Sequence, residues 1–152
     1  MAVVGCAVFV YQAMLKRASR LIPKGVSVCL LAERGFGDPQ LMRYWRDDLH
    51  WHFRIPLKSN SWIYRVGKGG KQLNQYHLAL GEVLLLHCVT LTKTPALNGL
   101  DLAVARDSLT QQMWMVVSAQ PTTLQTFREY GERFQIEEQL LDCSTKSLIA
   151  FN

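Results

Sequence analysis

Hydrophobic positions near the start of the chain have the spacing of a helix, and those that follow have the character of a strand. Between residues 8 and 21 apolar side chains recur every three or four positions, and Pro23 and Gly25 then interrupt the pattern. This spacing predicts a helix that ends before the proline. Residues 26–32 (VSVCLLA) form a continuous apolar run with β-branched members. Such a run is typical of a strand covered on both faces.

A second helix is predicted soon after this strand. Asp38 can cap a helix that has Pro39 at its first position, and residues 40–49 (QLMRYWRDDL) continue it. The order helix, strand, helix indicates a layered α/β core.

From Trp51 the pattern changes to alternation. In residues 51–58 (WHFRIPLK) apolar side chains alternate with polar ones, which predicts a strand with one face on the core. Further short apolar runs, one of them ended by the turn signal GKGGK, predict more strands. These runs are residues 61–66, 82–92, 100–107 and 113–119.

A final helix is predicted to begin at Thr122 or Thr123, both suitable caps, and to run through residues 124–141. We therefore predict a single domain over residues 1–152, with an α/β core interrupted by a β-rich insertion at about residues 51–118.

Composition and charge narrow the class of protein. The chain is 49% hydrophobic and 19% charged, as in ordinary globular proteins, and its net charge of +5 favours polyanions such as nucleic acid. The four cysteines are far apart and form no CxxC pair, so we expect free thiols in the cytoplasm. The apolar start is too short for a membrane span before Lys16, and no membrane is expected as a partner.

Acidic and basic residues at two places suggest a site. Glu33 is the first acidic residue of the chain and stands where the apolar run meets the turn RGFGD. On the final helix Tyr130, Arg133 and Glu137 are spaced i, i+3 and i+7, which places them on one face. Two interpretations stay open: the carboxylates meet to hold a cation, or these are solvent-exposed charges and a surface ion pair.

The segment LLAERGFGD, a β-rich interval and then YGERFQIEE, in this order, resemble bacterial insertion-sequence transposases of the DDE class. The similarity is to the cut-and-paste subgroup with a Tyr-x2-Arg-x3-Glu-x6-Lys signature on its last catalytic helix. It extends from about residue 8 to the end, and WHFRIPLKSNSWIYR and WMVVSAQPTTLQTFREYGERF are similar to the family's insertion and post-insertion segments. The resemblance implies a partial RNase H-like core and a function in DNA transposition, by DNA cleavage and strand transfer.

The resemblance also implies roles for particular residues. Glu33 and Glu137 match the second and third catalytic acids, which would hold Mg²⁺ for two-metal phosphoryl transfer. Tyr130 and Arg133 match residues that contact DNA phosphate, a task suited to the forked donors of arginine. The expected partners are transposon-end DNA and a second copy of the chain.

The chain departs from the family's pattern in three ways. The family's second acid is Asp, whereas Glu33 stands here, and the signature Lys falls at Ser144. No acidic residue precedes Glu33 to serve as the first catalytic Asp. These departures predict a truncated and catalytically impaired transposase fragment.

A mixture of basic and aromatic residues between positions 51 and 71 is the best candidate for contact with the DNA backbone. Arg54, Lys58 and Arg65 supply cations, and the aromatic residues between them can stack on bases. The alternative is an ordinary strand pair with outward charges. This block also supports a second function, a non-catalytic DNA-binding or dimerisation fragment in which the acids are only surface charge.

Overall fold

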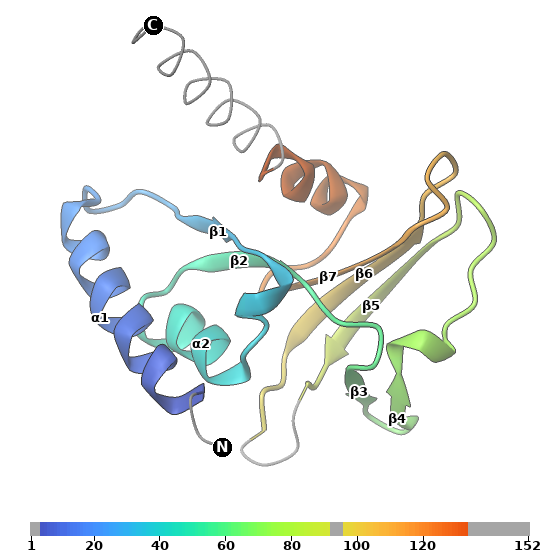
Figure 1. Ribbon diagram of the computed structural model, residues 1–152, viewed down its shortest axis with the longest axis horizontal. Helices are drawn as coiled ribbons and strands as arrows, with labels where there is room; N and C mark the ends of the chain where they lie inside the picture. Colours follow the sequence, from blue (N-terminus) through green and yellow to red (C-terminus); the bar gives the residue numbers. More distant parts are fainter. Residues whose placement is uncertain (1–3, 92–95, 134–152) are drawn as a thin grey trace, which may run out of the picture.

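The computed structural model describes residues 4–91 and 96–133 of the 152-residue chain. The fold is mixed α/β and is built on one five-stranded sheet with a separate two-stranded hairpin (Figure 1). The regular elements are α1 (Val4–Leu21), β1 (Cys29–Leu31), η1 (Arg34–Phe36), α2 (Pro39–Arg43), η2 (Tyr44–Asp48), β2 (His52–Pro56), β3 (Trp62–Arg65), β4 (Gly69–Gln72), η3 (Leu73–Gln75), β5 (Val83–Val89), β6 (Leu100–Arg106) and β7 (Met113–Ser118). Residues 124–133 are helical.

The sheet has the strand order β1-β2-β7-β6-β5. β1 and β2 are parallel, and every other pair in the sheet is antiparallel. β5, β6 and β7 therefore continue the sheet that β1 and β2 begin, and only the β3–β4 hairpin stands apart from it. In Figure 1, α1 and α2 lie beside the β1–β2 end, and the helix of residues 124–133 lies above the middle of the sheet.

The strand predicted in residues 26–32 is present, but the prediction that both of its faces are covered is wrong. β1 is only three residues long and is the edge strand, so Cys29 is exposed and its neighbours are half-buried. The hairpin also differs from expectation, because the GKGGK turn signal contains a strand. Tyr64 pairs with Gly70 and Arg65 with Gly69, so β4 is held by backbone pairing without an apolar pattern.

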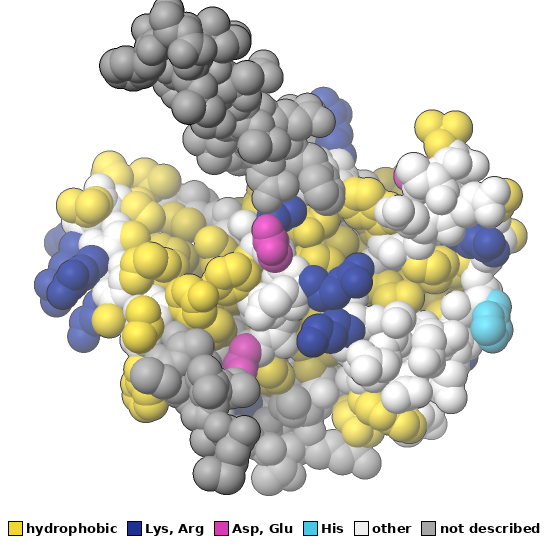
Figure 2. Space-filling model, viewed as in Figure 1, with side chains coloured by type: hydrophobic (Ala, Val, Ile, Leu, Met, Phe, Trp, Pro, Cys, Tyr) yellow, Lys and Arg dark blue, Asp and Glu magenta, His cyan; other side chains and the backbone are white. Residues whose placement is uncertain are grey.

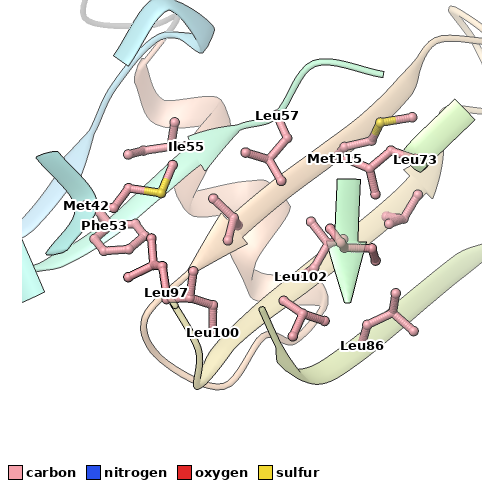
Figure 3. Close-up of a cluster of buried hydrophobic side chains, with 14 of the residues drawn as sticks. Met42, Phe53, Ile55, Leu57, Leu73, Leu86, Leu97, Leu100, Leu102 and Met115 are labelled. Carbon is pink, nitrogen blue, oxygen red and sulfur yellow. The ribbon is translucent and has the colours of Figure 1, made fainter. Parts of the chain in front are cut away.

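The hydrophobic core joins α2 to β2 and then continues under the hairpin (Figure 3). Phe53 and Ile55 of β2 are completely buried, as the alternation in residues 51–58 predicts. The Trp45 and Phe53 rings pack edge to face with their centroids 5.9 Å apart. Leu73, which follows β4, and Met115 of β7 belong to this same cluster of buried side chains. The hairpin is also joined to the sheet by a backbone bridge between Tyr64 and Thr90, just after β5.

The predicted cap of the second helix is confirmed, and its energetic contribution can be measured. The Asp38 carboxylate accepts hydrogen bonds from the backbone N–H groups of Gln40 (2.7 Å) and Leu41 (3.4 Å). We expect Asp38→Ala to lower the free energy of unfolding by about 1 kcal/mol, because these donors lose their acceptor. Urea denaturation checks this against Asp48→Ala, which removes an exposed carboxylate at the end of η2. Equal losses in both variants would contradict the capping role.

Candidate functional site

The last described helix starts where the sequence predicts, and its start is fixed by reciprocal hydrogen bonds. The N–H of Gln125 donates to Thr123 Oγ1 (3.1 Å), and the N–H of Thr123 donates to Thr126 Oγ1 (3.0 Å). Just before the cap, the buried N–H of Thr122 donates to Asp101 Oδ2 (3.1 Å). The helix is therefore tied to β6 at its first turn.

Asp101 also controls an irregularity in β5 that the sequence did not reveal. A register shift lies between Leu86 and Val89, and Cys88 within it has a φ of 54°, a conformation rare for a residue other than glycine. The N–H of Cys88 donates to Asp101 Oδ1 (3.2 Å), and His87 Nδ1 contacts the other carboxylate oxygen. One carboxylate thus fixes both the bulge and the entry to the last helix.

Arg54 of β2 attaches the same helix to the middle of the sheet. Its side chain is 6% exposed, and both Nε and Nη2 lie 3.0 Å from Glu129 Oε2. The guanidinium also donates to Ser118 Oγ (2.7 Å) and Gln120 Oε1 (3.2 Å). Arg54 was predicted to contact DNA, and the structure instead places its guanidinium inside the protein, where it binds the helix.

Glu33 and Arg133 meet although they are 100 positions apart in the sequence. Arg133 Nη2 donates to Glu33 Oε1 at 2.5 Å. The two side chains differ greatly in burial: Glu33 is 62% exposed and Arg133 is 13% exposed. The end of β1 and the last helix are therefore brought to one place, through an arginine and a carboxylate.

Tyr130 lies next to this ion pair and is buried. Its ring packs edge to face on Trp114 of β7, with centroids 5.9 Å apart. Burial raises the pKa of the Tyr130 hydroxyl, and the nearby guanidinium of Arg133 partly opposes this effect. The hydroxyl therefore stays protonated at neutral pH. Tyr130 and Arg133 share a site as their spacing predicts, whereas Glu137 lies outside the described residues.

A pocket of about 430 Å³ opens beside the ion pair, between the end of β1, β7 and the last helix. Its lining combines a carboxylate, two guanidinium groups, an amide and two aromatic rings. These residues include Glu33, Arg34, Gln112, Trp114, Tyr130 and Arg133. On the face of the molecule that Figure 2 shows, basic side chains gather near the middle, close to an acidic one. Such a lining can bind an anion that carries an apolar or aromatic group.

A second pocket, of about 280 Å³, shares Glu33 and Arg133 with the first and is otherwise mainly apolar. It lies between α1, β1 and η1, and its walls include Tyr11 and Phe36, whose rings pack edge to face. The ion pair therefore stands between a polar pocket and an apolar one.

The described residues do not fit a Mg²⁺ site. Within residues 4–91 and 96–133 no three His, Cys, Asp or Glu side chains come together as metal ligands. The Glu33 carboxylate is paired with the guanidinium of Arg133 and not with a metal-binding group. Mg²⁺ requires several oxygen ligands in near-ideal geometry. In the same part of the chain Cys29 and Cys88 are free thiols.

The β3–β4 hairpin carries a pair of stacked aromatic rings next to basic residues. Trp62 is 47% exposed and stacks on Tyr64 with an interplanar angle of 16°. Gly70 makes room for this stack, because a Cβ there would lie 2.6 Å from the Tyr64 ring. Lys58 is exposed and Arg65 is half-buried at the two ends of this segment. The alternation of residues 62–65 could have revealed the ring pair, but the role of the glycine depends on the pairing register.

No family model matches the chain, and no curated protein or solved structure is similar to it at the significance threshold applied. Among the helices in the described parts of the chain, none has the length and apolar character needed to cross a membrane.

Removing Glu129 should loosen the helix that carries Tyr130 and Arg133. We expect Glu129→Ala to lower the free energy of unfolding by about 1–3 kcal/mol, because the buried Arg54 loses its counter-charge. Chemical denaturation gives this value. Glu132→Ala is the matched control, since Glu132 is an exposed acid on the same helix and should change stability by less than about 0.5 kcal/mol.

The raised pKa of Tyr130 predicts a dependence of stability on alkaline pH. Since the pKa in the folded protein is above that of the unfolded tyrosine, about 10, the unfolded chain ionises first as the pH rises. The contribution of Tyr130 is fully present below the unfolded value and is lost as the pH rises through the folded value. Denaturation between pH 8 and 11 should show a shallower decline for Tyr130→Phe than for the wild type. Parallel declines would show that the hydroxyl is not buried.

Proposed function

We propose that the chain is a DNA-binding protein derived from a DDE transposase, with a partial RNase H-like core and impaired catalysis. The observation that carries this proposal is the meeting of Glu33 with Arg133 beside Tyr130. The resemblance assigns these residues to one phosphate-handling site, and they come from segments that are far apart in the sequence.

The pocket would take a phosphate of the DNA backbone. Arg34 and Arg133 offer cationic donors, and Tyr130 offers a protonated hydroxyl from the pocket wall. Guanidinium groups bind phosphate through paired, charge-assisted hydrogen bonds. Transposon-end DNA is the substrate that the resemblance implies, and a second copy of the chain is the implied protein partner.

The hairpin would extend the contact along the DNA. From Leu49 to Gly81 the sequence has no acidic residue, so the exposed Lys58 and the neighbouring Arg65, Lys68 and Lys71 have no acidic neighbour within this stretch of sequence. Cations in this arrangement displace the counterions of DNA and give salt-dependent affinity. Lys71 lies 4.1 Å from the centroid of the Tyr76 ring, which holds one of these charges in place.

The second candidate function is a non-catalytic DNA-binding or dimerisation fragment. Two observations favour it. The Glu33 carboxylate is already paired with Arg133, and DNA binding by the cationic hairpin needs no divalent ion. Cleavage in Mg²⁺ would require Glu33 and Glu137, the positions that match the family's acids, although the first catalytic Asp has no counterpart before Glu33. The two candidates share DNA binding and differ in the role of the acids: in the first, Glu33 and Glu137 are the remnant of a catalytic metal site, and in the second they are only surface charge.

DNA binding is tested with a fluorescent 30-base-pair duplex titrated at several salt concentrations. We expect the affinity to fall steeply with salt, and Arg133→Gln to weaken binding about tenfold and reduce the salt slope by about 1. Arg128→Gln is the matched control, because Arg128 is an exposed cation on the same helix and does not line the pocket. Equal effects of the two variants would contradict a phosphate site at Arg133.

Catalysis is tested by incubating the purified chain with supercoiled plasmid and either Mg²⁺ or Mn²⁺. We expect no nicking above background, since the first catalytic Asp is missing from the sequence. Nicking that disappears in Glu137→Ala would instead establish an active cleavage site.

A further inference from the structure

Glu33 and Arg133 are unequal partners. The Arg133 side chain is 13% exposed, and it lies against the pocket wall that Tyr130 and Trp114 form. The Glu33 side chain is 62% exposed, and Glu33 stands between β1 and the short η1 segment. The guanidinium is therefore fixed by its surroundings, whereas the carboxylate can turn into solvent with little loss of packing. An exposed carboxylate is screened by water, so its ion pair holds it only weakly.

The carboxylate is a chemical analogue of the expected ligand. Carboxylate and phosphate both bind guanidinium through anionic oxygens at similar distances. Glu33 Oε1 already lies at 2.5 Å from Arg133 Nη2, at the edge of a pocket of about 430 Å³. Arg34, adjacent to Glu33 in sequence, lines the same pocket and adds a second cation for an entering anion.

We propose that Glu33 is a built-in competitor: its carboxylate occupies the phosphate position on Arg133, and a backbone phosphate of DNA binds by displacing it. This inference rests on the proposed function, and it differs from the role of metal ligand that the resemblance assigns to Glu33. The displacement exchanges one ion pair for another, so no covalent bond is broken and no metal is needed. Glu33 then lowers the affinity for every anion and favours polyphosphate backbones, whose many contacts outweigh the loss of one exposed ion pair.

The test uses the whole chain and the same 30-base-pair duplex in the presence of EDTA. We expect Glu33→Gln to bind the duplex about two- to fivefold more tightly than the wild type, which corresponds to the loss of an exposed competing ion pair. Glu132→Gln removes the same charge from an exposed residue that is next to Arg133 in the sequence and does not line the pocket. It should give a smaller gain. In the double variant Glu33→Gln, Arg133→Gln, the gain from the first substitution should disappear.

Two results of this binding assay would overturn the inference. Weaker binding in Glu33→Gln would mean that Glu33 positions Arg133 for the ligand. Equal gains in Glu33→Gln and Glu132→Gln would mean that only net charge matters. Thermal unfolding of each variant shows whether it is folded, and Glu33→Asp, which keeps the charge, should bind the duplex more weakly than Glu33→Gln does.

A second readout separates this inference from the proposed function. Inorganic phosphate is titrated into ¹⁵N-labelled protein while the Arg133 side-chain Nε–H signal is followed. We expect saturable shifts at lower phosphate concentration in Glu33→Gln than in the wild type. If the duplex does not bind but this difference is present, the proposed function fails and the exchange at Arg133 stands. If the duplex binds and the phosphate titrations coincide, the exchange is wrong and DNA binding stands.

Discussion

The ion pair between Arg54 and Glu129 is the interaction on which the arrangement of this molecule depends. It joins a central strand to the last described helix, with Arg54 almost completely buried and both Nε and Nη2 directed at one carboxylate oxygen. A buried guanidinium requires a counter-charge, so the helix is held in one rotation about its axis. That rotation directs Tyr130 to Trp114 and Arg133 to Glu33.

The helix is thus joined to the sheet by ion pairs of opposite polarity. Glu129 on the helix binds Arg54 on the sheet, and one turn later Arg133 on the helix binds Glu33 at the end of β1. Both pairs join a buried guanidinium to a more exposed carboxylate, but the Glu129 side chain is 36% exposed and the Glu33 side chain 62% exposed. Glu33 is therefore the carboxylate that the fold holds less closely, whereas Glu129 fixes the helix on the sheet.

Several elements could be predicted from residues because the local signals are strong. The Asp38 cap, the start of the last helix at Thr123 and the buried face of β2 follow from side-chain hydrogen bonding and from alternation. The convergence of Tyr130 and Arg133 follows from helical spacing. What stayed hidden depends on tertiary structure. Arg54 lies on the polar face of an alternating strand, and it is buried only because a helix from the far end of the sequence covers that face.

Other differences also have physical causes. β4 has no apolar pattern, so only its pairing with β3 identifies it, and the edge position of β1 depends on a strand order that no local signal encodes. The Glu33–Arg133 contact was not predicted because the resemblance assigned both groups to ligands, not to each other. A carboxylate and a guanidinium that the fold brings to one place attract each other, and this contact depends on the tertiary structure alone.

The strand order has a consequence for how the chain reaches its native state. β7 pairs with β2 inside the sheet, and the hydrogen bond from Arg54 to Ser118 spans 64 positions of sequence. Closing so long a loop is entropically unfavourable, whereas β5, β6 and β7 can form an antiparallel meander from neighbouring segments. We therefore expect the meander to assemble early and β2 to dock on it late. The contacts of the buried arginine with Ser118 and Glu129 are then expected to form late, after the meander.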